Sequence, residues 1–141
     1  MRSTRAGALV LAVFLVCAFS TARAATTSGT QQAWHRVTLS FEGPEVSETG
    51  HPNPFTHYRL SVTFTGPDGR TMRVPGFYAA DGHAAESGAS SGNVWRVHFC
   101  PPAAGRWTWE ASFRAGAHVA LREKRDAGSP AAFDGASGTF T

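Results

Sequence analysis

The chain has 141 residues, of which 42% are hydrophobic, 16% charged and 11% aromatic, with 15 glycines and 8 prolines. This length fits one domain and leaves no room for a complete catalytic barrel. The composition is typical of a folded, loop-rich protein, and it excludes disordered, collagen-like and coiled-coil chains. The formal net charge of +3 suggests a basic protein, but the excess of basic residues lies entirely in the first segment.

Residues 1–24 have the pattern of a secretory signal peptide. Arg2 and Arg5 precede an apolar run that is too short to span a bilayer, and the small residues Ala22 and Ala24 follow it. We expect cleavage after Ala24, a secreted or periplasmic protein, and no membrane attachment once the segment is removed. A retained membrane anchor is the alternative.

Cleavage would remove three arginines and no acidic residue, which leaves ten basic and ten acidic side chains. The remaining basic residues are dispersed, apart from the short run Arg122–Arg125. Nucleic-acid binding requires a basic surface that neutralises phosphates, so this class of function is excluded. Cys100 becomes the only cysteine, so the domain has to be held together by its core and not by an internal disulfide.

Small polar residues over 25–33 are expected to form a linker, with the folded domain over 34–141. A first strand is expected at Trp34–Phe41, because apolar and polar residues alternate there, and Gly43-Pro44 is expected to end it. The clearest alternation covers Tyr58–Thr65, and a Gly-Pro-Asp-Gly turn follows it.

The returning strand is expected over Arg70–Tyr78, interrupted at Pro75-Gly76, and a loop is expected over Ala79–Gly92. Alternation then predicts strands at Trp95–Phe99 and Trp107–Arg114, and a short strand at Val119–Leu121. A last strand begins at Gly138 and meets the end of the sequence without a stop signal. We therefore expect this strand to be truncated, with the natural polypeptide continuing.

About seven antiparallel strands with no helical period predict an all-β, immunoglobulin-like β-sandwich. A small closed barrel is the alternative. The predicted core consists of the apolar residues that share one phase in three strands: Leu60, Val62, Phe64, Trp95, Val97, Phe99, Trp107, Trp109 and Phe113.

No motif in the sequence supplies a catalytic, cofactor-binding or metal-binding constellation. The six histidines form no ligand pair at a zinc spacing, and Cys100 has no cysteine partner. Gly88–Gly92 matches the Gly-x-Ser-x-Gly pattern by letter, but it lies in a predicted loop with no helix after it. The acidic residues of the loops are expected to be solvated, so we expect no enzyme activity from this chain.

Aromatic residues are the better candidates for a contact surface. Trp34, at the start of its strand, and Tyr78, at the edge of a long loop, are expected to be exposed. The loop Gly76–Gly92 is the expected functional edge, because binding residues concentrate on loops held by a rigid scaffold. A surface loop without a role is the alternative. The candidate residues for an interface or a sugar contact are Trp34, Phe77, Tyr78, Asp81 and His83.

Five segments in order resemble one domain family: Trp34–Phe41, Pro52–Leu60, Val74–Gly82, Trp95–Phe99 and Gly105–Trp109. This family is the N-terminal domain of unknown function 5060, an immunoglobulin-like sandwich ahead of the (β/α)-barrel of secreted bacterial glycoside hydrolases. The resemblance covers Trp34–Thr141, while Cys100 stands where none is expected. It implies a non-catalytic accessory module whose partner is the catalytic barrel. A carbohydrate-binding module that uses exposed aromatic residues to contact polysaccharide is the alternative.

The signal-peptide assignment predicts that the exported protein begins at Ala25. N-terminal sequencing of protein recovered from outside the cytoplasm checks this expectation. Protein that keeps Met1 and sediments with membranes would contradict it.

Overall fold

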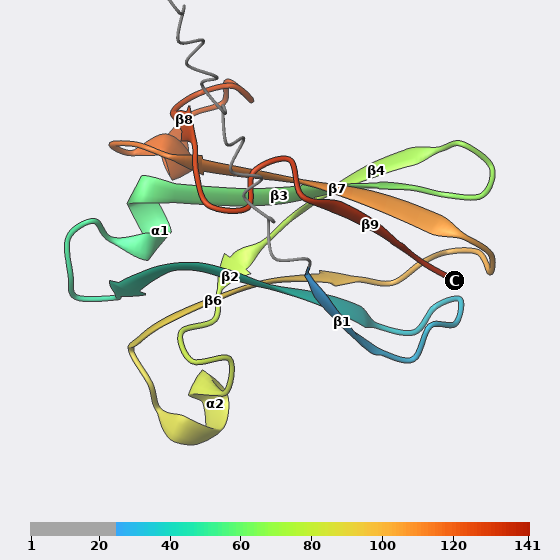
Figure 1. Cartoon of the computed structure of the whole chain (residues 1–141), viewed down its shortest axis with the longest axis horizontal. Helices are drawn as coiled ribbons and strands as arrows, with labels where there is room; N and C mark the ends of the chain where they lie inside the picture. Colours follow the sequence, from blue (N-terminus) through green and yellow to red (C-terminus); the bar gives the residue numbers. More distant parts are fainter. Residues whose placement is uncertain (1–24) are drawn as a thin grey trace, which may run out of the picture.

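The computed structural model describes residues 25–141, and residues 1–24, with the predicted signal peptide, lie outside this part. Within residues 25–141 the chain forms two antiparallel sheets, A and B, that face each other as two layers (Figure 1). The predicted antiparallel sandwich is therefore confirmed, and the alternative of a closed barrel is wrong. No helix in this part of the chain has the length and apolar character needed to cross a bilayer.

Sheet A has the strand order β1-β2-β6-β5. Its strands are β1 (Thr26–Gly29), β2 (Val37–Ser47), β6 (Ser91–Phe99) and β5 (Phe77–Tyr78). Sheet B has the order β4-β3-β7, and the two ends of β7 pair with β8 and β9. Its strands are β4 (Thr71–Pro75), β3 (Tyr58–Thr65), β7 (Trp107–Ala115), β8 (Ser129–Pro130) and β9 (Ser137–Phe140). Three short helices complete the fold: α1 (Pro54–His57), α2 (Ala84–Ser87) and the 3-10 helix η1 (Val119–Leu121).

The core between the sheets is largely aromatic, and all nine residues predicted for it are buried. Phe64 of sheet B stacks on Phe99 of sheet A, with ring centroids 4.0 Å apart and the rings nearly parallel. Trp95 of sheet A meets Phe113 of sheet B edge-on at 4.9 Å. These contacts join the two layers across the sandwich, and aromatic pairs add to the stabilisation that burial alone supplies.

Several details differ from the predicted elements. The segment 25–33, expected as a linker, contains β1, which pairs with β2. Gly43-Pro44 does not end a strand, because β2 continues past it through an irregularity in its pairing with β6 between Glu42 and Val46. Val119–Leu121 is a 3-10 helix and not a strand, with the Leu121 N–H bonded to the His118 carbonyl, and only Val119 of the three is buried.

The interruption predicted at Pro75-Gly76 is the point where the chain leaves sheet B and enters sheet A. The Gly76 N–H donates to the Leu60 carbonyl at 2.9 Å. A Cβ at Gly76 would collide with the Leu60 side chain and would lie 2.8 Å from the Arg96 carbonyl oxygen. Only glycine fits this crossing between the layers, and the crossing places β5 at the edge of sheet A.

Replacing Phe64 or Phe99 with Ala should cost about 3–5 kcal/mol, because each change leaves a cavity between the two sheets. Urea unfolding of the purified variants measures this loss. Leu121→Ala is the matched control, since Leu121 is 73% exposed and its loss should change stability by less than about 0.5 kcal/mol. Wild-type melting of either Phe variant would contradict the assigned core.

Candidate functional site

The outer face of sheet A carries a row of three side chains beside its edge strand. Phe77 of β5 pairs with Arg96 of β6, and Arg96 pairs with Ser40 of β2. Residues paired in this way lie on the same face of a sheet. The Arg96 Nε donates to the Ser40 hydroxyl at 3.1 Å, and Phe77 remains 42% exposed. An exposed aromatic ring and a guanidinium group are therefore neighbours.

Tyr78 points the opposite way, into the core. Its ring packs on Trp95 at 5.1 Å, and its hydroxyl lies 2.6 Å from the Val46 carbonyl oxygen and 3.0 Å from that of Gly92. Burial, reinforced by the carboxylates of Glu45 and Glu48, raises the pKa of the hydroxyl. The prediction that Tyr78 is exposed is wrong, because residues in a strand alternate between the two faces and Phe77 takes the outer one.

The segment after β5 is more ordered than the predicted loop, because it contains α2. Asp81 accepts hydrogen bonds from the His83 N–H and the Ser87 hydroxyl, each at 2.7 Å. These bonds, the Ser87 hydroxyl foremost, lower the pKa of the Asp81 carboxyl. Asp81 therefore organises the segment that leads into α2, and its carboxylate oxygens are engaged within that segment.

The segment that contains α2 and the outer face of sheet A enclose a cavity of about 350 Å³. We call it the β5 hollow. Its aromatic and ionisable lining residues are Phe77, Tyr78, His83, Glu86, Arg96 and His98. Gly82 also lines it, with φ at +85°, and a Cβ there would lie 3.1 Å from a terminal nitrogen of Arg96. Glycine thus allows the backbone to pass close to the guanidinium group.

His98 forms one wall of the β5 hollow. Its ring contacts Phe77 at a centroid distance of 5.0 Å, and its Nδ1 lies 2.9 Å from the Thr38 hydroxyl. Burial, together with the positive charges of Arg36 and Arg96, lowers the pKa of His98. The imidazole is therefore neutral at pH 7, when one ring nitrogen donates and the other accepts.

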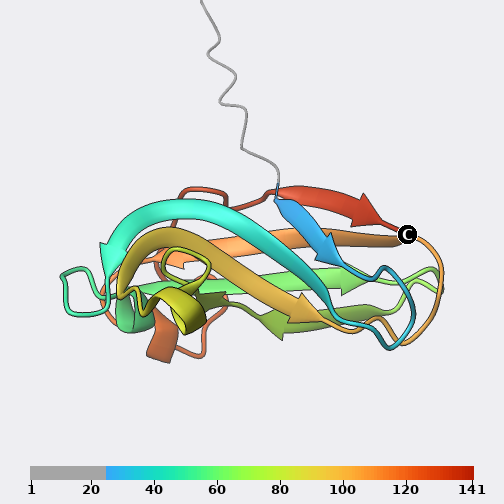
Figure 2. The same ribbon diagram turned by 90° about the horizontal axis from the view of Figure 1, so that it is seen from below.

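Trp34 lies away from this site. The loop that carries it joins β1 to β2 at the end of the sandwich where the chain terminates, opposite α1 and α2 (Figure 2). Trp34 is 74% exposed, as predicted, and its N–H donates to the Pro101 carbonyl at 2.8 Å. Of the five predicted contact residues, the structure thus brings Phe77, Tyr78 and His83 to one hollow. It places Asp81 beside that hollow and Trp34 elsewhere.

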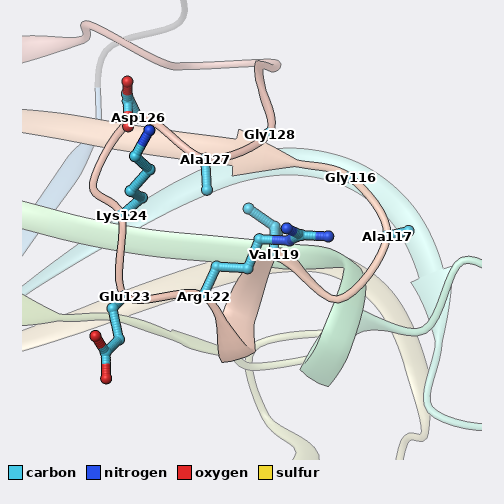
Figure 3. Close-up of a pocket in the computed structure, with 9 residues that line it drawn as sticks. All are labelled: Gly116, Ala117, Val119, Arg122, Glu123, Lys124, Asp126, Ala127 and Gly128. Atoms are coloured by element: carbon cyan, nitrogen blue, oxygen red, sulfur yellow. The ribbon is translucent and has the colours of Figure 1, made fainter.

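A larger cavity, of about 700 Å³, lies within the segment between β7 and β8 (Figure 3). Two guanidinium groups hold this segment through its carbonyl oxygens. Arg59 donates to those of Val119, Arg122, Lys124 and Arg125, and Arg114 donates to those of Asp126, Ala127 and Gly128. Six of the nine residues that line this cavity have their carbonyl oxygens occupied in this way, and none of the nine is aromatic, so the β5 hollow is the better candidate site.

Within residues 25–141, no three His, Cys, Asp or Glu side chains are grouped so that they could hold a metal ion. Histidine rings do come together at the α1 end, where His51 and His118 each contact His57, at centroid distances of 4.6 and 5.8 Å. The His57 Nδ1 lies 2.9 Å from the Thr56 hydroxyl and 3.3 Å from the Asn53 N–H. These bonds give that ring nitrogen a structural role.

Sequence reasoning did not identify Arg96 and His98 as site residues. Both occupy the polar phase of a strand whose apolar phase was assigned to the core, and a polar phase indicates only exposure to solvent. The order of the strands could have identified them. Phe77 lies in an edge strand, so the residue paired with it in the neighbouring strand has to lie beside it on the same face of the sheet. That neighbour is β6, which follows β5 in sequence after the α2 segment.

Tyr78→Phe removes a buried hydroxyl and leaves two carbonyl oxygens without this donor, so it should cost about 1–3 kcal/mol at pH 7. The raised pKa of Tyr78 adds a pH dependence. Above about pH 10 the unfolded chain loses the proton first, so wild-type stability should fall as the pH rises through the folded pKa. The variant lacks this loss. Urea unfolding between about pH 7 and 11 measures it, and parallel pH profiles for both proteins would contradict the raised pKa.

The comparisons with known proteins agree with this architecture. A crystal structure of a putative glycoside hydrolase from Bacteroides vulgatus is similar to 77% of this chain, with 28% sequence identity and a TM-score of 0.50. The chain spans only 15% of the length of that protein. No curated protein matches the sequence. A family model described as Domain of unknown function (DUF5060) matches residues 30–114, which is more than half of the chain. The chain therefore belongs to the DUF5060 family.

Proposed function

We propose that this domain is a non-catalytic accessory module of an exported glycoside hydrolase, and that it packs against the catalytic barrel through a surface around Trp34. The similarity to a segment of a glycoside hydrolase supports the enzymatic context. In the β5 hollow Glu86 is the one carboxylate among the lining residues that the structure describes. Glycoside hydrolysis ordinarily needs two carboxyl groups that flank the bond, so this hollow does not supply the pair, and we assign the chemistry to the catalytic barrel.

Trp34 is the observation that carries this proposal. We define the Trp34 surface by the exposed residues Gln31, Trp34 and Thr141. A tryptophan that is 74% exposed leaves a large apolar area in water, and such residues are frequent anchors of protein interfaces. Its backbone has φ at +67°, a left-handed conformation that is unfavourable for a bulky residue. The hydrogen bond from its N–H to Pro101 helps to hold that conformation.

The position of Trp34 also fits a contact within one polypeptide. The Thr141 N–H donates to the Gln31 side-chain oxygen at 3.3 Å, three residues before Trp34. A catalytic domain that followed residue 141 would begin beside this surface. The export predicted from residues 1–24 suits an enzyme that meets polysaccharides outside the cytoplasm. Carbohydrate binding, the second candidate function, is favoured by the exposed Phe77 in the β5 hollow.

The test grafts residues 25–141 in place of the matching segment of the Bacteroides vulgatus protein and follows unfolding by calorimetry. Packing through the Trp34 surface predicts that Trp34→Ala weakens the coupling between the domains, by about 2 kcal/mol for an aromatic anchor. The calorimetric transition should then separate into two. Leu121→Ala is the control, because Leu121 is equally exposed and lies on η1. Identical transitions for the two variants would contradict the proposal.

A further inference from the structure

We propose that the β5 hollow binds a neutral sugar unit of a polysaccharide, with Phe77 beneath the apolar face of the sugar and Arg96 and Glu86 on its hydroxyl groups. The inference relies on the proposed glycoside-hydrolase function only for the source of the ligand. The Trp34 surface takes no part in it, so either proposal can fail alone.

The first support is the combination of groups in the hollow. A sugar ring has one face of C–H groups and a rim of hydroxyls, so it needs an apolar plane and several polar partners. Phe77 supplies the plane, since its ring is partly exposed and packs in a tilted arrangement against the His98 ring. Pockets of this kind join an aromatic wall to a few polar groups that fix the orientation of the ligand.

Arg96 is placed to act as the donor. Its Nε is engaged with Ser40, which fixes the direction of the guanidinium group. Within residues 25–141, neither terminal nitrogen of Arg96 takes part in a hydrogen bond or an ion pair. A planar guanidinium group offers parallel N–H groups that suit two neighbouring oxygens. Two adjacent sugar hydroxyls present that spacing.

The charges in the hollow favour a neutral ligand over an acidic one. The lining holds one permanent cation, Arg96, and one carboxylate, Glu86. Just outside the lining, the carboxylate of Asp81 lies in the same segment as Glu86 and the charge of Arg36 acts on His98, so cations and carboxylates balance. A uronic acid or a phosphate would gain from Arg96 but would be repelled by these carboxylates. Hydroxyl groups both donate and accept, so a neutral sugar satisfies the guanidinium, the carboxylate and the imidazole together.

The size of the hollow is consistent with this ligand. Its volume of about 350 Å³ lies at the lower end of the range for small-molecule sites, which suits one or two sugar rings of a longer chain. The lowered pKa of His98 keeps this wall neutral. With its Nδ1 at the Thr38 hydroxyl, the remaining ring nitrogen is available to a ligand.

The experiment titrates the whole exported chain, labelled with ¹⁵N, with neutral oligosaccharides of glucose, xylose, mannose and galactose, and separately with galacturonate oligosaccharides. Amide resonances in NMR spectra report the binding position. At least one neutral set should shift the amides of Phe77, Gly82 and Arg96 more strongly than galacturonate does. The amide of Trp34 should stay unchanged.

Two variants test the assigned roles. Phe77→Leu keeps an apolar side chain but loses the flat ring, and Arg96→Gln loses the guanidinium group. Each should raise the dissociation constant about tenfold or more, as expected for loss of a stacking or charged hydrogen-bonding partner. Leu121→Ala, an exposed apolar residue outside the hollow, should bind as the wild type does. Unchanged melting temperatures show that the variants are folded.

Three results would overturn the inference. In the first, no neutral set shifts the amides of the hollow. In the second, galacturonate binds more tightly than every neutral set. In the third, folded Phe77→Leu and Arg96→Gln retain wild-type affinity. A negative titration would not contradict the proposed packing against a barrel, because the titration tests the β5 hollow and the grafting experiment tests the Trp34 surface.

Discussion

The insertion of Tyr78 between two segments of sheet A is the contact on which the candidate site depends. Its hydroxyl reaches the carbonyls of Val46 and Gly92, which lie at the far end of β2 and at the start of β6. Its ring rests on Trp95. This one side chain therefore ties the two-residue edge strand β5 to its neighbour β6 and to β2 beyond it. Because side chains alternate along a strand, an inward Tyr78 requires an outward Phe77.

The rest of the hollow follows from that orientation. Phe77 can face outward beside Arg96 only because the chain crosses from sheet B to sheet A at Gly76, where the backbone touches both layers. After β5, the Ala79 N–H and the Ala80 carbonyl pair with Val94 of β6, so the register continues into the segment that covers the outer face. The site is thus built on a sheet edge whose inner side is anchored in the aromatic core.

The aromatic core holds the two sheets of the described residues together without a disulfide. Cys100 is exposed and unpaired in the part of the chain that the structure describes. The two sheets are joined instead by ring contacts such as Phe64 on Phe99. A core of large, fully buried aromatic residues supplies more apolar area per residue than aliphatic side chains do. The scaffold can therefore carry an edge strand of only two residues.

Strand alternation predicted the main sheets and the buried phase of each strand, because period two is a strong signal wherever one face is buried. The phases of Tyr58–Thr65 and of Trp95–Phe99 hold in the structure. The same signal is too weak for β1, whose small polar residues TTSG pair with β2 largely through backbone and remain mostly exposed. It is also too weak for Val119–Leu121, where three apolar residues do not distinguish a strand from a helical turn.

The candidate site was predictable only in part for a related reason. The sequence indicates that Phe77 and Tyr78 are adjacent, but in a strand of two residues the alternation is too short to tell which side chain faces the core. Tyr78 was expected at the surface because it stands at the edge of a long loop, and the two carbonyls that accept from its hydroxyl come from segments distant in sequence. Arg96 enters the site through strand pairing, which also depends on tertiary structure.

Native-state hydrogen exchange tests most directly whether Tyr78 anchors the site. The amides of Ala79 and Val94 join the β5 segment to β6, and the amide of Ala111, bonded to Ala136 in sheet B, is the reference. If Tyr78 holds this edge, Tyr78→Phe should speed exchange at Ala79 and Val94 more than at Ala111, because local opening becomes easier than global unfolding. Equal acceleration at all three amides, or none, would contradict the anchoring role.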